Sequence, residues 1–179
     1  IKNPIFGKVK TRLAATAGHE KAFEVYQQLL QHTRQITAKI TGDRHLYYTD
    51  FVDSTDEWDT VIYQKHLQKQ TPDLGLKMYA SFRDMHQKGY EKAVIIGSDC
   101  IENTTEIIEN AFVELAEKQA VIGKATDGGY YAIGLNFSKL ADNDAILSAL
   151  FLNKHWSHSQ VAAEALEVFA HYQLTYAEL

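Results

Sequence analysis

The sequence has little cysteine and proline, and it lacks a long hydrophobic run. Cys100 is the single cysteine among 179 residues, so no internal disulfide can form, and we expect a reducing compartment, the cytoplasm. The uninterrupted apolar runs have only the length of a strand, so we expect no membrane span. Because no linker or repeat is visible and the chain is long enough to bury a core, we expect one domain over residues 1–179.

Basic residues are also in deficit. Asp and Glu number 23 against 18 Lys and Arg, which gives a formal net charge of −5. Sequence-independent binding of nucleic acid usually needs a basic face, so we expect no nucleic-acid partner. The hydrophobic share of 45% and the charged share of 23% are those of an ordinary globular protein.

Both ends of the sequence lie beside expected strands. Residues 1–4 enter a loop that a doubly wound sheet would normally feed from its first strand. Residues 176–179 stop inside or just after another expected strand. We therefore expect the natural protein to have a short strand before Ile1 and further residues after the last one.

A short apolar run, residues 93–96, leads directly into Gly97-Ser98-Asp99-Cys100. Such a run predicts a strand buried on both faces, as in the centre of a parallel α/β sheet. Asp99 then follows the carboxyl end of this strand, where open α/β sheets bind their ligands. Its carboxylate is a candidate for holding a metal or a substrate hydroxyl, although the run alone supports a structural role nearly as well.

The cations concentrate near the start of the chain. Residues 2–12 hold four of them around one proline and one glycine, which predicts a loop. Lys8, Lys10 and Arg12 alternate along it and can point toward one anion. A solvated basic turn is the simpler explanation, but this concentration in an acidic chain favours a diphosphate site. Arg12 can bind a diphosphate bidentately, with the lysines as point charges.

Hydrophobic spacing predicts alternating helices and strands over the rest of the chain. The expected helices cover residues 18–40, 76–86 with Asp73 as N-terminal acid, 107–115, 143–152 and 159–170, and the expected strands cover 44–49, 93–96, 120–123, 132–135 and the segment from 176. Residues 63–70 fit either a short strand or a turn. The acidic residues 50–59 are expected to form a solvated loop without chemistry.

A second aspartate follows the predicted strand 120–123. The sequence there is Asp127-Gly128-Gly129-Tyr130, and Asp-Gly-Gly is a common hairpin turn, so a turn alone explains it well. Two buried strands that each end in an aspartate would nevertheless place Asp99 and Asp127 at the same edge of the sheet. Two carboxylates near a basic loop suit a diphosphate that carries Mg²⁺.

Several motifs together resemble one bacterial family. They are Lys2-Asn3-Pro4 with Gly7-Lys8-Val9-Lys10-Thr11-Arg12-Leu13, Asp73-Leu74-Gly75 with Met78, Gly97-Ser98-Asp99-Cys100, Asp127-Gly128-Gly129-Tyr130-Tyr131 with Gly134, and Trp156-Ser157. In this order, over nearly the whole chain, they resemble the glycosyltransferase-like proteins called radical-SAM/selenodomain-associated transferases, in the nucleotide-diphospho-sugar transferase superfamily. The family usually has proline where this chain has Ile101, and arginine where it has Lys77.

The resemblance implies a three-layer α/β/α domain with the Rossmann-like GT-A fold and a mostly parallel mixed sheet. It also implies a nucleotide over the N-terminal loop and Mg²⁺ or Mn²⁺ near Asp99. Carried over to this sequence, it assigns nucleotide and phosphate contacts to Asn3, Lys8, Lys10, Arg12 and Ser98, a substrate loop to Gly128, Gly129 and Tyr130, and the catalytic and metal-binding roles to Asp99 and Asp127.

These observations favour a metal-dependent transferase that uses a nucleotide-activated small molecule, a nucleoside-diphosphate sugar attacked by an acceptor at its anomeric carbon. Asp127 then acts as general base toward the acceptor or as a second metal ligand. Nucleotidyl transfer, as in guanylyltransferases that release pyrophosphate, uses the same cations and carboxylates and stays open. So does a protein that binds nucleotides without turnover.

Overall fold

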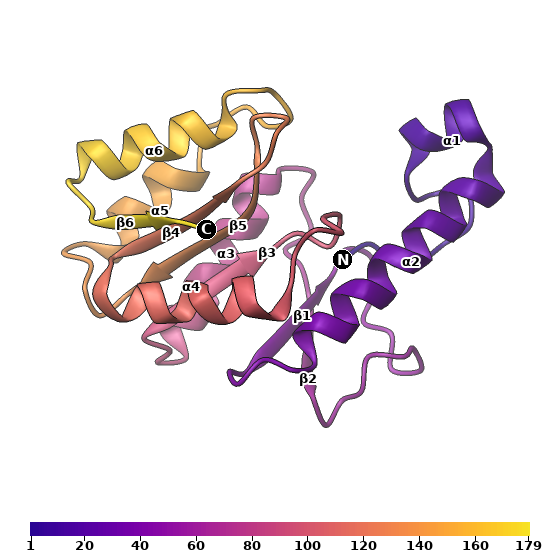
Figure 1. The fold of residues 1–179 in the computed structure, drawn as a ribbon, viewed down its shortest axis with the longest axis horizontal. Coiled ribbons are helices and arrows are strands. Elements are labelled where there is room, and N and C mark those ends of the chain that lie inside the picture. The colour runs from indigo at the N-terminus through magenta and orange to yellow at the C-terminus, as the bar shows by residue number, and fades with distance from the viewer. The chain divides into compact units, whose positions relative to one another are not determined.

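The computed structural model describes residues 1–179 and divides into two compact units. The first unit consists of Ile1–Gln68 and Gly97–Thr105, and the second of Lys69–Ile96 and Glu106–Leu179. The chain thus passes from the second unit to the first after Ile96, and it returns to the second unit at Glu106 (Figure 1). None of the helices combines the length and the apolar character that a membrane crossing requires.

In the first unit, a long helix packs on a pair of parallel strands. The elements are α1 (Thr11–Ala17), α2 (His19–Thr37), β1 (Arg44–Tyr48) and β2 (Tyr63–Leu67). Tyr26 and Leu30 lie four residues apart on α2 and therefore share one face of the helix. They pack into one hydrophobic cluster with residues of the strands and loops, namely Val9, Leu46, Tyr48, Trp58 and Tyr63.

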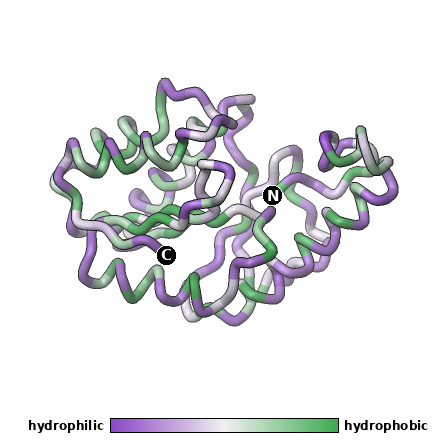
Figure 2. Tube along the Cα trace, turned by 45° about the horizontal axis from the view of Figure 1, so that its top comes forward, coloured by the Kyte–Doolittle hydropathy of each residue, from purple (hydrophilic) through white to green (hydrophobic).

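In the second unit, helices cover both faces of a four-stranded sheet. The elements are α3 (Leu74–Gln87), β3 (Lys92–Ile96), α4 (Thr105–Glu117), β4 (Ala120–Lys124), β5 (Tyr130–Asn136), α5 (Asn143–Phe151), α6 (Val161–His171) and β6 (Tyr176–Glu178). Figure 1 shows α4 on one side of the sheet and α5 and α6 on the other. Hydrophobic residues run along the strands in Figure 2, and Val121, Ile133 and Leu135 are at most 1% exposed.

The strand order of this sheet is β3-β5-β4-β6. β5 is antiparallel to both β3 and β4, so β3 and β4 run in the same direction and end at the same edge of the sheet. β6 is parallel to β4. The α/β class with a mixed sheet is confirmed, but parallel and antiparallel pairings occur equally often in the two sheets, so the expected parallel majority is absent.

The expected central position of residues 93–96 is wrong. β3 lies at the end of the strand order, and all five of its residues are half-buried rather than buried. The hairpin strand β5 takes the place beside it. An apolar run indicates that neighbours cover a strand, but it carries no information on which strand lies next to it.

The other expected helices and strands are confirmed, with ends that differ by a few residues. Residues 63–70, which fitted a strand or a turn, contain β2. Asp73 caps α3, because its carboxylate accepts a hydrogen bond from the backbone N–H of Leu76 at 3.0 Å. The short helix α1 was not expected, since its seven residues are too few for a clear helical period and follow the basic loop directly.

Candidate functional site

The basic loop is held to α2 by Tyr26, whose side chain is 3% exposed. The Tyr26 hydroxyl donates to the carbonyl of Lys2 at 2.7 Å and accepts from its backbone N–H at 3.0 Å. Burial raises the pKa of this hydroxyl well above its ordinary value, and the charges of Asp99 and Asp50 raise it further. The start of the loop is therefore fixed on the helix by a hydroxyl that stays protonated.

Asn3 fixes the same loop from the other side. Its side chain is 2% exposed and donates from Nδ2 to the Phe51 carbonyl at 2.9 Å. Its Oδ1 accepts from the backbone N–H groups of Asp50 and Phe51 at 3.2 and 3.3 Å. These three bonds attach the loop to the chain that follows β1. The structure thus gives Asn3 a positioning role, and its contact with a nucleotide stays a prediction.

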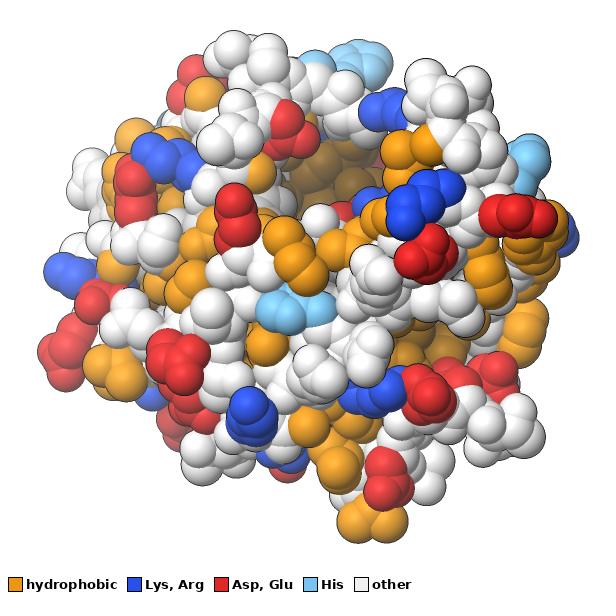
Figure 3. All heavy atoms as spheres, turned by 45° about the vertical axis from the view of Figure 1, so that its right-hand side comes forward, with side chains coloured by type: hydrophobic (Ala, Val, Ile, Leu, Met, Phe, Trp, Pro, Cys, Tyr) orange, Lys and Arg blue, Asp and Glu red, His pale blue; other side chains and the backbone are white.

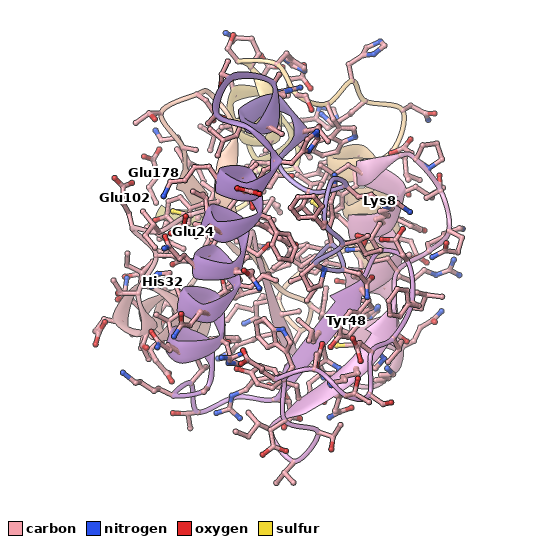
Figure 4. The ribbon with its side chains drawn as sticks, turned by 90° about the vertical axis from the view of Figure 1, so that its right-hand side faces the viewer. Lys8, Glu24, His32, Tyr48, Glu102 and Glu178 are labelled. Atoms are coloured by element: carbon pink, nitrogen blue, oxygen red, sulfur yellow. The ribbon has the colours of Figure 1, made fainter.

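Lys10 and Asp99 meet in the first unit, although they are far apart in sequence. The Lys10 ammonium lies 3.1 Å from Asp99 Oδ2, and the two side chains are 25% and 66% exposed. Lys10 has a left-handed backbone, with φ 46° and ψ 43°, immediately before α1. Lys8, labelled in Figure 4, and Arg12 precede and follow it in the sequence, and both are exposed. One cation of the basic loop, Lys10, is therefore paired with the acid of the Gly-Ser-Asp-Cys segment.

The segment that carries Asp99 is fixed to α2 by two hydrogen bonds. His32 Nε2 contacts the Asn103 carbonyl at 2.8 Å, and the Thr105 hydroxyl donates to the Ile36 carbonyl at 2.9 Å. In Figure 4, His32 lies on the same side of α2 as Glu102. The segment also holds two half-buried residues that flank Asp99, Ser98 and the free thiol of Cys100.

Asn103 is a residue of this segment that sequence reasoning missed. Its side chain is 1% exposed, and neither Oδ1 nor Nδ2 has a hydrogen-bond partner. Buried amides without partners are rare in folded proteins. No pattern in the sequence separates it from an ordinary polar residue ahead of a helix.

In the second unit, Asp127 lies in the turn between β4 and β5. Its Oδ1 accepts from the backbone N–H of Gly129 at 3.0 Å, and its side chain is exposed. The expected hairpin turn is confirmed. Gly128 has φ +88°, and a Cβ there would lie 2.0 Å from the Ser159 carbonyl oxygen. Its own carbonyl accepts from the N–H of Ala162 at 2.9 Å, so the turn is attached to the start of α6.

Tyr130, the last residue of the predicted substrate loop, points into the second unit. Its hydroxyl lies 3.8 Å from the sulfur of Met78 on α3, and burial raises its pKa. Asp127 therefore belongs to the second unit and Asp99 to the first. The convergence of the two carboxylates stays a prediction.

Trp156 packs directly on α3 in the second unit. A Cβ on Gly75 would lie 2.7 Å from Trp156 Nε1 and 1.9 Å from the Phe151 carbonyl oxygen. The indole N–H is buried without a partner. Ser157, the next residue, has a left-handed backbone with φ 68°. The glycine in Asp73-Leu74-Gly75 is thus explained by close packing, which the sequence alone signalled only as a motif.

The acidic stretch 50–59 is more ordered than expected. Asp56 accepts from the Lys65 ammonium at 2.6 Å and from the Tyr48 hydroxyl at 2.6 Å. The Lys65 side chain is 6% exposed and that of Asp56 16%. Lys65 also donates to the Asp53 carbonyl at 2.8 Å. The expectation of a solvated loop is therefore wrong for Asp56, which forms a covered ion pair.

The described residues contain no group of three or more His, Cys, Asp or Glu side chains that could hold a metal ion by themselves. Mg²⁺ is often bound by one or two carboxylates, with the remaining ligands from substrate phosphates and water. Asp99 is exposed enough for such a role, and it lies beside the Lys10 ammonium, a group that suits phosphate. The first unit therefore offers one exposed carboxylate beside a cation, and the role of Asp99 as metal ligand stays a prediction.

Charges of both signs are mixed on the surface. Figure 3 shows Lys and Arg side chains interspersed with Asp and Glu side chains, without a continuous basic area on the face in view. The site around Lys10 and Asp99 follows the same pattern, with cations and a carboxylate side by side.

The chain belongs to the bacterial family described as "Uncharacterized protein conserved in bacteria (DUF2064)", which it matches over residues 30–158. It is also similar to a crystal structure from Desulfovibrio desulfuricans G20 named "putative nucleotide-diphospho-sugar transferase". The TM-score is 0.86 and the sequence identity 28%, and the match covers all of this chain and 76% of that one. No curated protein matches the chain. These similarities place it with the nucleotide-diphospho-sugar transferase superfamily.

Proposed function

We propose that this protein is a metal-dependent transferase that uses a nucleotide-activated donor, specifically a nucleoside-diphosphate sugar. The observation that carries the proposal is the 3.1 Å contact between Lys10 and Asp99, which joins the basic loop to the acid of the Gly-Ser-Asp-Cys segment. Cations and a carboxylate in one place are what a diphosphate with a divalent metal requires. The structural similarity to the Desulfovibrio protein supports the donor class.

Each residue of the site has a role in this proposal. Lys8, Lys10 and Arg12 bind diphosphate oxygens, with Arg12 as the bidentate donor. Asp99 holds Mg²⁺ or Mn²⁺, which offsets the negative charge that develops on the leaving diphosphate. Ser98 contacts the nucleotide beside it. The backbone positions of the loop come from Tyr26 and Asn3, which bind it on two sides.

The acceptor side of the proposal rests on Asp127. Its exposed carboxylate accepts a proton from the acceptor hydroxyl as general base, or completes the metal site as a second ligand. Gly128, Gly129 and Tyr130 form the substrate loop, and the attachment of Gly128 to α6 limits the movement of that loop. We further propose a cytoplasmic location and the radical-SAM/selenodomain-associated subtype within the family.

Nucleotide binding with metal is the first test. A thermal-shift panel of nucleoside diphosphates, triphosphates and sugar nucleotides is measured with and without Mg²⁺ or Mn²⁺. A ligand at 100 times its Kd stabilises the protein by about 2.7 kcal/mol. We expect Asp99→Asn to lose the metal-dependent part of the shift, while Glu102→Gln, an exposed carboxylate in the same segment, keeps it. The proposal is refuted if no nucleotide raises the melting temperature in the presence of metal.

The reaction class is tested by the products. Release of a nucleoside diphosphate from a sugar nucleotide supports glycosyl transfer. Release of pyrophosphate from a nucleoside triphosphate supports nucleotidyl transfer instead. Nucleotide binding without consumption of any donor supports a binding protein.

A further inference from the structure

The proposed metal ligand Asp99 already has a cationic partner in the protein itself. Lys10 Nζ lies 3.1 Å from Asp99 Oδ2 and is the more covered of the two groups. The chain from Ile1 to Ala17 contains four cations and no carboxylate side chain, so Lys10 has no competing acid within its own segment. The ammonium thus stands where a cation bound to Asp99 would stand.

The backbone of Lys10 is held at the start of α1. A left-handed conformation is unusual for a residue other than glycine, asparagine or aspartate, and Lys10 adopts it at φ 46°. It precedes α1 without a side-chain capping bond, while its carbonyl accepts from the N–H of Ala14 at 2.9 Å. The helix start holds the backbone, and the side chain is left to contact Asp99.

The pair has a consequence for metal binding. One positive and one negative charge at contact distance largely cancel for an approaching free ion, which must also displace the ammonium. The described residues offer no additional cluster of ligands to compensate for this loss. A diphosphate changes the balance, because its oxygens both ligate the metal and accept hydrogen bonds from Lys10.

We propose that Lys10 excludes free divalent metal from Asp99, and that metal binds there only together with a nucleoside diphosphate, which takes over the Lys10 ammonium. This inference rests on the proposed function and adds the order in which the ligands bind. Metal and nucleotide enter as one complex, and Lys10 exchanges the carboxylate for phosphate oxygens at that moment. Lys10 is thus a specificity-determining residue for the ligand as well as a phosphate contact.

The test measures the affinity for Mn²⁺ in the absence of nucleotide. Binding is detected by calorimetry or by the loss of the electron paramagnetic resonance signal of the free ion. We expect Lys10→Met to bind Mn²⁺ at least tenfold more tightly than the natural protein. Lys2→Met removes an exposed cation from the same loop and is expected to leave Mn²⁺ affinity unchanged. Adding Asp99→Asn to Lys10→Met is expected to abolish the gain.

Lys10→Gly provides a second variant, because glycine tolerates the left-handed backbone, removes the charge and brings no metal ligand of its own. It is expected to show the same gain, and it decides the question if Lys10→Met does not fold. The inference is overturned if the folded variants bind Mn²⁺ no more tightly than the natural protein. Failure of the natural protein to bind any nucleotide with metal would instead refute the proposed function, and the two results are distinguishable.

Discussion

At the scale of single residues, Gly75 sets the distance between α3 and the residues packed on it. A methyl group there would meet the carbonyl oxygen of Phe151 and the indole of Trp156 well inside contact distance. We expect Gly75→Ala to lower the free energy of unfolding by about 3 kcal/mol, at the upper end of overpacking costs, because one of the obstructing atoms belongs to the backbone. Urea unfolding measures this difference.

Gly42 provides the matched control for that measurement. A Cβ at Gly42 would have no neighbour within 4 Å, and its φ lies outside the left-handed region. Gly42→Ala is therefore expected to change the unfolding free energy by less than about 1 kcal/mol. Equal losses in the two variants would show that the packing of Trp156 on α3 is looser than described.

Sequence reasoning was more successful with charged residues of the site than with amides. The basic loop and Asp99 stand out because cations are concentrated in an acidic chain and because an acid follows an apolar strand. The structure brings Lys10 and Asp99 together. The role of Asn3 depends on backbone groups of residues 50 and 51, whose position no local pattern reports. Long-range hydrogen bonds of this kind leave no periodic signal in a sequence.

At the scale of elements, the loop between β1 and β2 depends on Lys65. Its ammonium and the Tyr48 hydroxyl both bind Asp56, and all three groups are largely covered. Removing one partner of a covered ion pair leaves an uncompensated charge, so Lys65→Met is expected to destabilise the protein by about 3–5 kcal/mol. Chemical denaturation measures the loss.

An exposed ion pair of the same unit is the control. Lys21 and Glu24 lie 2.9 Å apart on α2 with more than half of each side chain exposed. Lys21→Met is expected to cost about 0–1 kcal/mol, because water screens such pairs. If Lys65→Met costs no more than this, the loop around Asp56 is solvated, as its composition alone suggested.

Elements with a clear period were predicted well, and strand order was not. The apolar stripe of α2 and the apolar runs of β4 and β5 reflect burial, which a sequence records directly. The place of β3 beside the antiparallel β5 depends on the hairpin at Asp127. Whether Asp-Gly-Gly makes only a turn or also carries chemistry depends on groups outside the motif. That choice cannot be made from the spacing of residues.

At the scale of the whole molecule, the two units are expected to differ in the free energy of local unfolding. β4 and β5 each have a paired strand on both sides, and most of their residues are buried. β1 and β2 form a sheet of two strands, which draws its stability from the cluster with α2. We expect amide hydrogens of β4 and β5 to exchange more slowly than those of β1 and β2.

Hydrogen exchange followed by mass spectrometry tests this expectation peptide by peptide. A nucleotide with Mn²⁺ should slow exchange in the basic loop and in β1, since these belong to the unit with Lys10 and Asp99. Uniform protection across both sheets would instead indicate that the chain opens as a single cooperative body.

The position of Cys100 gives the chain a built-in attachment point for a reporter. It is the one thiol of the molecule, it is free and half-buried, and it follows Asp99 directly. A fluorophore coupled to it sits beside the proposed metal ligand without any engineered cysteine. Arrival of a metal–nucleotide complex, and release of the Lys10 ammonium from Asp99, can then be followed in real time as a change in emission.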